Sequence, residues 1–294
     1  MADHRPPTPA RRPDNVRPRS TPPPPEPPQL DPEPPSPAEL QAIERQMLGL
    51  TELSGATVEA RSDLAGLLVR RTRYGPAFNY LAAIRWPEVN WPSSLQVTQR
   101  RFRDLEEWPC VVVAGGLTTP PELADDLERR GWLPLERETI LWTRRGAVVP
   151  HLDPWLRVEA VTARTAALYE QLEREVFELS ATSAEDRASL LVRAVEAGRL
   201  RAYLVRLHGE PVAVARLTAR DGIAALYGIG VAGHARRQGL GRLITTVATR
   251  AALATGNRLV WLSVDEKNDA ARSLYASLGF GPAFAWVRLL GPSE

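Results

Sequence analysis

The chain has 294 residues, of which 44% are hydrophobic and 24% are charged, and its formal net charge is +2 at pH 7. This length predicts two domains, because one domain takes roughly 150 residues, and the near-neutral charge excludes a protein whose overall field draws it to nucleic acid or to a membrane. The single cysteine, Cys110, excludes an internal disulfide, and no Cys/His cluster has the spacing of metal ligands. No apolar run approaches the roughly 20 residues that span a bilayer, so we expect a cytoplasmic protein without a metal.

The first 37 residues differ in composition from the rest of the chain. They hold 15 of the 27 prolines and almost no apolar residues, so they cannot bury enough surface to offset the entropy of ordering. We expect residues 1–37 to form a disordered tail with polyproline II character. The arginines of this tail, beginning with Arg5 and Arg11, leave open a role in binding nucleic acid, although an extension without a partner is the simpler interpretation.

The remaining sequence alternates between helix and strand patterns on both sides of a proline-containing linker at residues 146–154. The first half predicts a short amphipathic helix at 38–50, apolar runs at 64–69 and 78–84, helices at 93–106 and 121–130, and strands at 110–114 and 137–143. The second half predicts strands at 157–161, 201–207, 211–218, 223–231, 258–264 and 283–290, with helices at 165–179, 188–197, 240–255 and 270–278. Two α/β domains are therefore expected, at residues 38–149 and 155–292.

The most informative segment runs from Ile229 to Arg242, IGVAGHARRQGLGR, where a predicted strand passes through a loop into a predicted helix. The start of a helix exposes unpaired N–H groups and the positive end of the helix dipole, which together bind phosphate. Gly239 and Gly241 allow close approach of the backbone, and the neighbouring arginines supply fork-shaped donors. The segment therefore predicts a pyrophosphate site, and its glycine spacing matches neither the Walker A loop nor the dinucleotide fingerprint.

Two signatures together resemble those of a known family. The pattern Arg236-x-x-Gly239-x-Gly241 resembles the acyl-CoA loop of the GNAT superfamily of N-acetyltransferases. Asn268 to Phe280, NDAARSLYASLGF, resembles the second signature of the family, in which an Asn precedes a helix with Leu-Tyr and a terminal Leu-Gly-Phe. The resemblance covers roughly residues 155–290 and implies a mixed, mostly antiparallel GNAT sheet flanked by helices.

The resemblance also implies a reaction, in which an amine directly attacks the acetyl group of acetyl-CoA. Strands 223–231 and 258–264 would part near a bulge at Gly228–Gly230, a backbone N–H near Ile229 or Val231 would stabilise the oxyanion, and Tyr275 would protonate the leaving thiolate. The residues that would contact acetyl-CoA are Ile229, Gly230, Val231, Arg236, Arg237, Gln238, Gly239, Leu240, Gly241, Arg242, Asn268 and Ala271. Taken alone, a tyrosine at the place of Tyr275 is more often a packing residue, and an asparagine at the place of Asn268 is more often a helix cap.

The sequence does not identify the acceptor amine or the general base. Strand 223–231 has no Asp, Glu or His, so Asp265, Glu178 or a water chain would have to deprotonate the amine. Three glutamates before the hairpin, Glu175, Glu178 and Glu185, could bind a cationic amine or could form a solvated helix face. The sequence gives no indication of the oligomeric state.

The first half lacks both signatures, so we do not expect it to bind acetyl-CoA. Its segment from Pro121 to Trp132 ends in Arg-Gly-Trp where the second half has Leu-Gly-Phe, and residues 52–145 resemble the non-catalytic N-terminal domain of tandem GNAT proteins. In that case the stretch from Trp86 to Trp91 could line the acceptor pocket; the alternative is an unrelated small α/β domain. Mycothiol synthase is another tandem GNAT protein, but the tail and the early C-terminus weigh against it. A non-catalytic acyl-CoA sensor remains the main alternative to an N-acetyltransferase.

Overall fold

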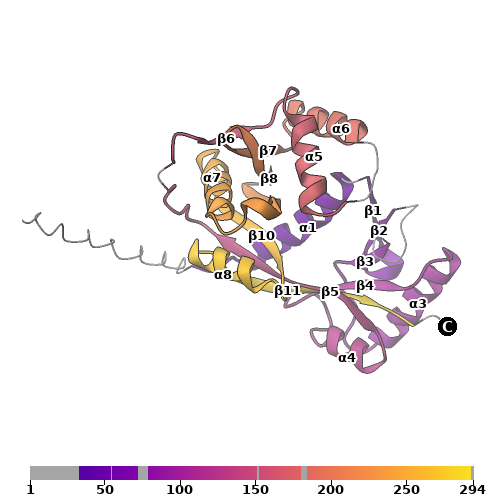
Figure 1. Cartoon of the computed structure of the whole chain (residues 1–294). Coiled ribbons are helices and arrows are strands. Elements are labelled where there is room, and N and C mark those ends of the chain that lie inside the picture. Colours follow the sequence, from indigo (N-terminus) through magenta and orange to yellow (C-terminus); the bar gives the residue numbers. More distant parts are fainter. Residues whose placement is uncertain (1–32, 54, 72–78, 151, 180–183, 293–294) are drawn as a thin grey trace, which may run out of the picture.

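The computed structural model describes residues 33–53, 55–71, 79–150, 152–179 and 184–292. Within these residues, helices flank one open and mostly antiparallel sheet (Figure 1), which confirms the predicted mixed α/β fold class. Residues 1–32 of the predicted disordered tail lie outside the described residues.

The elements follow the predicted order. The first half contributes α1 (Pro37–Leu53), β1 (Thr57–Arg61), β2 (Gly66–Arg70), β3 (Tyr80–Ala82), α3 (Trp91–Asp104), β4 (Cys110–Ala114), α4 (Leu123–Arg129) and β5 (Leu133–Thr143). The second half contributes β6 (Leu156–Ala160), α5 (Ala166–Val176), α6 (Ala184–Glu196), β7 (Arg201–Leu207), β8 (Glu210–Arg220), β9 (Ile223–Val231), α7 (Leu240–Ala254), β10 (Leu259–Asp265), α8 (Asp269–Ser277) and β11 (Gly281–Leu290). The predictions for β4, β7 and β9 are confirmed with the same bounds, whereas the sequence does not predict β1, whose residues are mostly exposed.

The strands of the described residues lie in the order β1-β2-β3-β4-β11-β5-β10-β9-β8-β7-β6. Two neighbouring pairs are parallel, β3 with β4 and β9 with β10, and the others are antiparallel. A helix connects the two strands of each parallel pair, α3 in the first half and α7 in the second, because a parallel pair needs a long crossover.

Each half places its last strand next to the other half. β5 pairs with β10, with Glu138 opposite Asp265 and Thr143 opposite Val260, and β11 pairs with β4. β5 and β11 also pair with each other in the middle of the sheet. The predicted domains at 38–149 and 155–292 therefore describe the order of the chain but not this exchange of strands, which long-range pairing alone decides.

α1 provides a second connection between the halves. Ser36 and Glu39 form a capping box at its start, since the Glu39 amide donates to Ser36 Oγ and the Ser36 amide donates to Glu39 Oε2. Ile43 is fully buried in a cluster with Leu259 and Trp261 of β10. The same helix buries Leu48 against β2, β3 and β4 of the first half, so α1 packs on strands of both halves.

The last helices of the two halves end with the same geometry. Gly131 and Gly279 each follow a helix end with φ of +85°, a conformation that glycine adopts without strain. The Trp132 amide donates to the Leu127 carbonyl at 3.0 Å, and the Phe280 amide donates to the Tyr275 carbonyl at 3.1 Å. This equivalence supports a structural repeat and places Leu127 at the position of Tyr275, so the first half lacks the hydroxyl there.

Trp86 is buried in the core of the first half. Its side chain is 1% exposed, its indole N–H donates to the Leu64 carbonyl at 2.8 Å, and its amide donates to the Thr119 carbonyl at 3.0 Å. These hydrogen bonds tie the chain segment after β3 to the residues around Leu64 and Thr119. The prediction that the Trp86–Trp91 stretch lines an acceptor pocket is therefore wrong for Trp86, because its ring fills the core.

Candidate active site

The strands β9 and β10 run side by side only at their first residues. Their pairing joins Ile223–Ala225 to Leu259–Trp261 and goes no further, although β9 continues to Val231 and β10 to Asp265. On its other side β9 stays paired with β8 as far as Val231. The last residues of β9 therefore turn one backbone edge toward a gap in the sheet.

A bulge in β9 accompanies this gap, as predicted. The register with β8 shifts between the pair Val214–Gly230 and the pair Arg216–Tyr227, so the extra residue lies at Gly228–Ile229. Gly228 has a φ of +57°, which favours glycine. Gly230 serves packing, because a Cβ on it would overlap Val176 and lie 3.0 Å from the Phe177 ring.

The loop after β9 leads into α7, and no side chain caps the N-terminus of this helix. A short 3₁₀ turn at Gly233–Ala235 leads to Arg237, with a φ of +66°, and to Gly239, with a φ of +78° at the N-cap of α7. No side chain caps α7, so its first N–H groups keep their capacity to bind an anion. Gln238 is exposed, as are Arg236, Arg237 and Gly239, whereas Leu240 is buried and packs in the core.

The three arginines of the loop differ in their contacts. Arg236 Nε donates to the Val231 carbonyl at 3.2 Å, and Arg242 donates to Ser277 Oγ at 2.6 Å. Arg237 is exposed and makes no side-chain hydrogen bond to another described residue. Arg242 therefore ties the start of α7 to α8, and Arg236 and Arg237 are the better placed to bind a phosphate group.

Gly241 brings α8 close to the loop. A Cβ on Gly241 would lie 3.3 Å from Leu274 of α8 and 3.8 Å from Val231 of β9. The small size of this glycine therefore permits close packing of α7, α8 and β9, which is a structural reason for its place in the motif. Tyr275 directly follows Leu274 in α8.

Tyr275 is a buried phenol without a hydrogen-bond partner among the described residues. Its side chain is 7% exposed, and its ring lies 6.0 Å from that of Phe280. Burial raises the pKa of Tyr275 to about 12. The phenol is thus protonated at neutral pH and able to donate its proton.

Asn268 caps α8, which is the local role that its type predicts. Asn268 Oδ1 accepts a hydrogen bond from the Ala271 amide at 3.1 Å. Asn268 is exposed and Ala271 is partly exposed, so both remain accessible; their contact with acetyl-CoA stays a prediction.

A buried charge cluster lies behind the bulge of β9, and the sequence did not predict it. Arg216 donates to Glu170 at 2.8 Å and to Glu173 at 2.6 Å, and Arg187 donates to the same two carboxylates. Glu173 Oε1 lies 3.3 Å from the position of a Cβ on Gly228. Burial raises the pKa of Glu173 and nearby Arg216 opposes the rise. The cluster fixes α5 against β8 and β9.

The predicted base candidates are exposed. Asp265 Oδ1 accepts a hydrogen bond from the Lys267 amide at 2.7 Å in a turn, and Glu178 follows α5 with a φ of +50°. Glu175 is also exposed, and the side chain of Glu185 lies outside the described residues. Tyr227 faces the charge cluster, and burial raises its pKa to about 12, so it is not a base at neutral pH.

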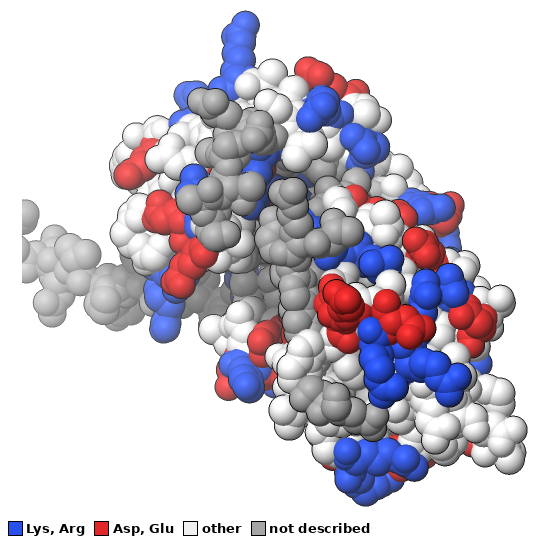
Figure 2. Space-filling model, turned by 90° about the vertical axis from the view of Figure 1, so that its right-hand side faces the viewer, with Lys and Arg blue, Asp and Glu red and all other residues white. Residues whose placement is uncertain are grey.

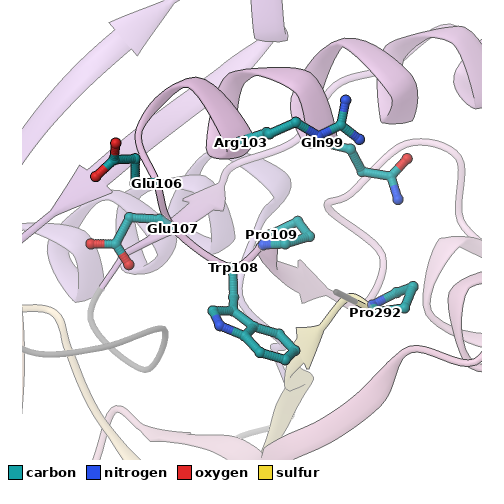
Figure 3. Close-up of a pocket in the computed structure, with 7 residues that line it drawn as sticks. All are labelled: Gln99, Arg103, Glu106, Glu107, Trp108, Pro109 and Pro292. Carbon is teal, nitrogen blue, oxygen red and sulfur yellow. The ribbon is translucent and has the colours of Figure 1, made fainter. Parts of the chain in front are cut away.

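The described residues also form a cavity of about 200 Å³ far from these signatures in the sequence (Figure 3). It lies where α3 and β4 meet the end of β11, and it is lined by Gln99, Arg103, Glu106, Glu107, Trp108, Pro109 and Pro292. It contains none of the residues predicted to contact acetyl-CoA.

Two searches of the described residues bear on other functions. No group of three or more His, Cys, Asp or Glu side chains has an arrangement that could hold a metal ion, and no helix there combines the length and apolarity needed to cross a membrane. On the face shown in Figure 2, basic and acidic side chains lie next to one another, so neither charge dominates that face.

Comparison with known proteins identifies the same segment. Residues 165–280 match the model of the acetyltransferase (GNAT) family. A mycothiol acetyltransferase from Streptomyces avermitilis is 36% identical over 80 residues, which are 26% of this chain and 26% of that protein. The match therefore spans about a quarter of the length of this curated relative.

Solved structures show the same fold over most of the chain. A GCN5-related N-acetyltransferase from Kribbella flavida has a TM-score of 0.63 at 23% identity and covers 86% of this chain and 96% of its own. A tandem GNAT protein from the clavulanic acid biosynthesis pathway has a TM-score of 0.56 at 19% identity and covers 86% of this chain and 97% of its own. The fold is thus that of tandem GNAT proteins, and the residues that match the model of the GNAT acetyltransferase family, 165–280, carry the loop before α7 and Tyr275.

Proposed function

We propose that the chain is an acetyl-CoA-dependent N-acetyltransferase, which transfers an acetyl group by direct attack to the primary amine of a small molecule or peptide. The observation that carries the proposal is the gap between β9 and β10 directly before the uncapped start of α7. Three features then follow one another along the chain. β9 offers a free backbone edge for an extended arm, the start of α7 offers N–H groups for phosphate, and α8 carries the buried phenol.

The residues at this place fit acetyl-CoA, which would supply an activated acetyl group. The N–H groups from Gln238 to Arg242, with the side chains of Arg236 and Arg237, would hold the diphosphate. The free edge of Ile229, Gly230 and Val231 would hold the extended arm of the molecule, and Asn268 and Ala271 would contact it from α8. A backbone N–H of Ile229 or Val231 would stabilise the charge that develops on the carbonyl oxygen.

Tyr275 would give its proton to the sulfur as the carbon–sulfur bond breaks. A pKa raised to about 12 keeps the hydroxyl protonated at neutral pH. Because no described residue accepts a hydrogen bond from this hydroxyl, it is available to the leaving group.

The test is turnover of acetyl-CoA with a panel of primary amines, followed by detection of the free thiol. We expect Tyr275→Phe to lower kcat by roughly 100-fold or more while the dissociation constant for acetyl-CoA, measured by calorimetry, stays the same. Tyr203→Phe is the matched control, since Tyr203 is also buried but lies on β7, away from the gap. Full activity of Tyr275→Phe would show that another group protonates the thiolate.

A non-catalytic acyl-CoA sensor is the second candidate, because β9 carries no carboxylate or imidazole to take a proton from an amine. It predicts binding of acetyl-CoA without transfer to any amine of the panel. The panel should include the acceptor of mycothiol acetyltransferase, given the similarity of an 80-residue segment to that enzyme.

A further inference from the structure

The exchanged strand β5 places a carboxylate of the first half one strand away from the gap of the second half. Glu138 lies opposite Asp265, and Ile140 lies opposite Ser263, so Glu138, Ser263 and Asp265 share one face of the sheet. These residues lie beyond Trp261, the last residue of β10 that pairs with β9. Glu138 is therefore one strand away from the gap, at the level where the gap is open.

The surroundings of Glu138 suit a group that exchanges a proton. Its side chain is only partly exposed, and Ser263 donates a hydrogen bond to it. Burial, together with the negative charges of Glu136 on β5 and Asp265 on β10, raises the pKa of Glu138 to about 7, against the opposing effect of Arg288 on β11. Arg288 pairs with Glu136 at 3.2 Å, and no salt bridge to Glu138 is found among the described residues.

Glu173 is the competing carboxylate, and its contacts make it a structural group. It accepts bonds from Arg216 at 2.6 Å and from Arg187 at 3.0 Å. Two guanidinium groups hold this carboxylate, and taking a proton would break both ion pairs. Glu138, with a hydroxyl as its hydrogen-bond partner, has no such constraint.

We propose that Glu138 is the general base of the acetyl transfer and that the acceptor is an amine that arrives protonated, as a cation. This inference rests on the proposed function. The Glu138 carboxylate takes one proton from the acceptor nitrogen, directly or through one water, because neighbouring strands lie only about 4.8 Å apart. The nitrogen forms its bond to the acetyl carbon and loses its second proton, the carbon–sulfur bond breaks, and the Tyr275 hydroxyl gives its proton to the sulfur. Glu138 then releases the first proton to solvent, and the second proton lost by the nitrogen replaces, through water, the one that Tyr275 gave up.

The experiment compares Glu138→Gln with Glu136→Gln in the full chain, using the best amine from the panel. For the unmodified protein we expect kcat/KM to fall as the pH drops below about 7, because the base must be ionised. Glu138→Gln should lose about 100-fold of kcat/KM at pH 7 and should lack this ionisation. Glu136→Gln should shift the ionisation to lower pH, because it removes a neighbouring negative charge.

A measurement without turnover accompanies the kinetics. In protein labelled with ¹³C at the glutamate carboxyl carbons, one resonance should titrate near pH 7 and should be missing from the spectrum of Glu138→Gln. Acetyl-CoA binding and thermal unfolding of each variant report on its fold.

The outcomes separate the two proposals. If the unmodified protein acetylates no amine, both the proposed function and the role of Glu138 are wrong. If it does and Glu138→Gln keeps the same rate at pH 7, or Glu136→Gln leaves the pH profile unchanged, only the role of Glu138 is overturned.

Discussion

Removal of the charge of Glu39 should loosen the start of α1 from β5 and β10. Glu39 accepts two hydrogen bonds from Arg144, at 3.0 and 2.9 Å, and one from Arg258 at 3.1 Å. Arg144 follows β5 and Arg258 precedes β10, so a single carboxylate holds the start of α1 against both strands. Glu39→Gln keeps the shape of the side chain and of the capping box but removes the charge.

The expected loss follows from the pKa of Glu39, which the Arg144 guanidinium lowers from 4.5 to about 2. This difference corresponds to about 3 kcal/mol of unfolding free energy. Because Arg258 is 53% exposed and water screens its charge, we expect a loss of about 2 kcal/mol. A carboxyl group with a lowered pKa stabilises the folded state above pH 4.5, and this stabilisation disappears as the pH falls through 2.

The assay is urea denaturation of the full chain, followed by tryptophan fluorescence at several pH values. Glu39→Gln should be less stable than the unmodified protein at pH 7, and the difference should shrink progressively below about pH 4.5. Glu52→Gln, at an exposed position of the same helix, should change stability little. A difference between Glu39→Gln and the unmodified protein that stays constant down to pH 3 would refute the ion-pair explanation.

Two further predictions concern the packing of the second half, beside those for Tyr275 and Glu138. Gly230→Ala should lower the unfolding free energy by about 1–3 kcal/mol, since its Cβ would overlap Val176. Gly233→Ala is the control and should be nearly neutral, because the space around Gly233 is open. Equal melting temperatures for the two variants would contradict the proposed packing. A fragment of residues 155–294 should show no cooperative thermal transition, because it lacks β5 and α1, and a sharp melt monitored by circular dichroism would show that the exchanged strand is dispensable.

Local pattern was sufficient to predict most elements of the fold. β4 is an unbroken apolar run, and a glycine at positive φ follows the ends of α4 and α8. The residues next to one another in the sequence are therefore enough to predict where these elements lie. The exchange of β5 and β11 could not be predicted in this way, because either strand has the composition needed to pair with β10. Pairing between strands more than 100 residues apart depends on the whole sheet.

The residues of the candidate site could also be predicted from the sequence only in part. The loop from Arg236 to Gly241 and the position of Tyr275 follow from motifs, and the structure adds that Gly241 serves packing. Glu138 and Glu173 escaped sequence reasoning because a glutamate on a strand or an amphipathic helix usually faces solvent. Only the tertiary structure shows that one lies beside the gap and the other between two arginines.

The exchange of strands between the halves also bears on how the protein is made. As the chain leaves the ribosome, β4 and β5 are complete long before β11, yet the sheet position between them stays empty until residues 281–290 emerge. Until then one backbone edge of each strand lacks its partner, a condition that promotes aggregation. The first half is therefore expected to depend on chaperones during synthesis, and the rate at which the last ten strand residues arrive becomes part of the folding of the whole molecule.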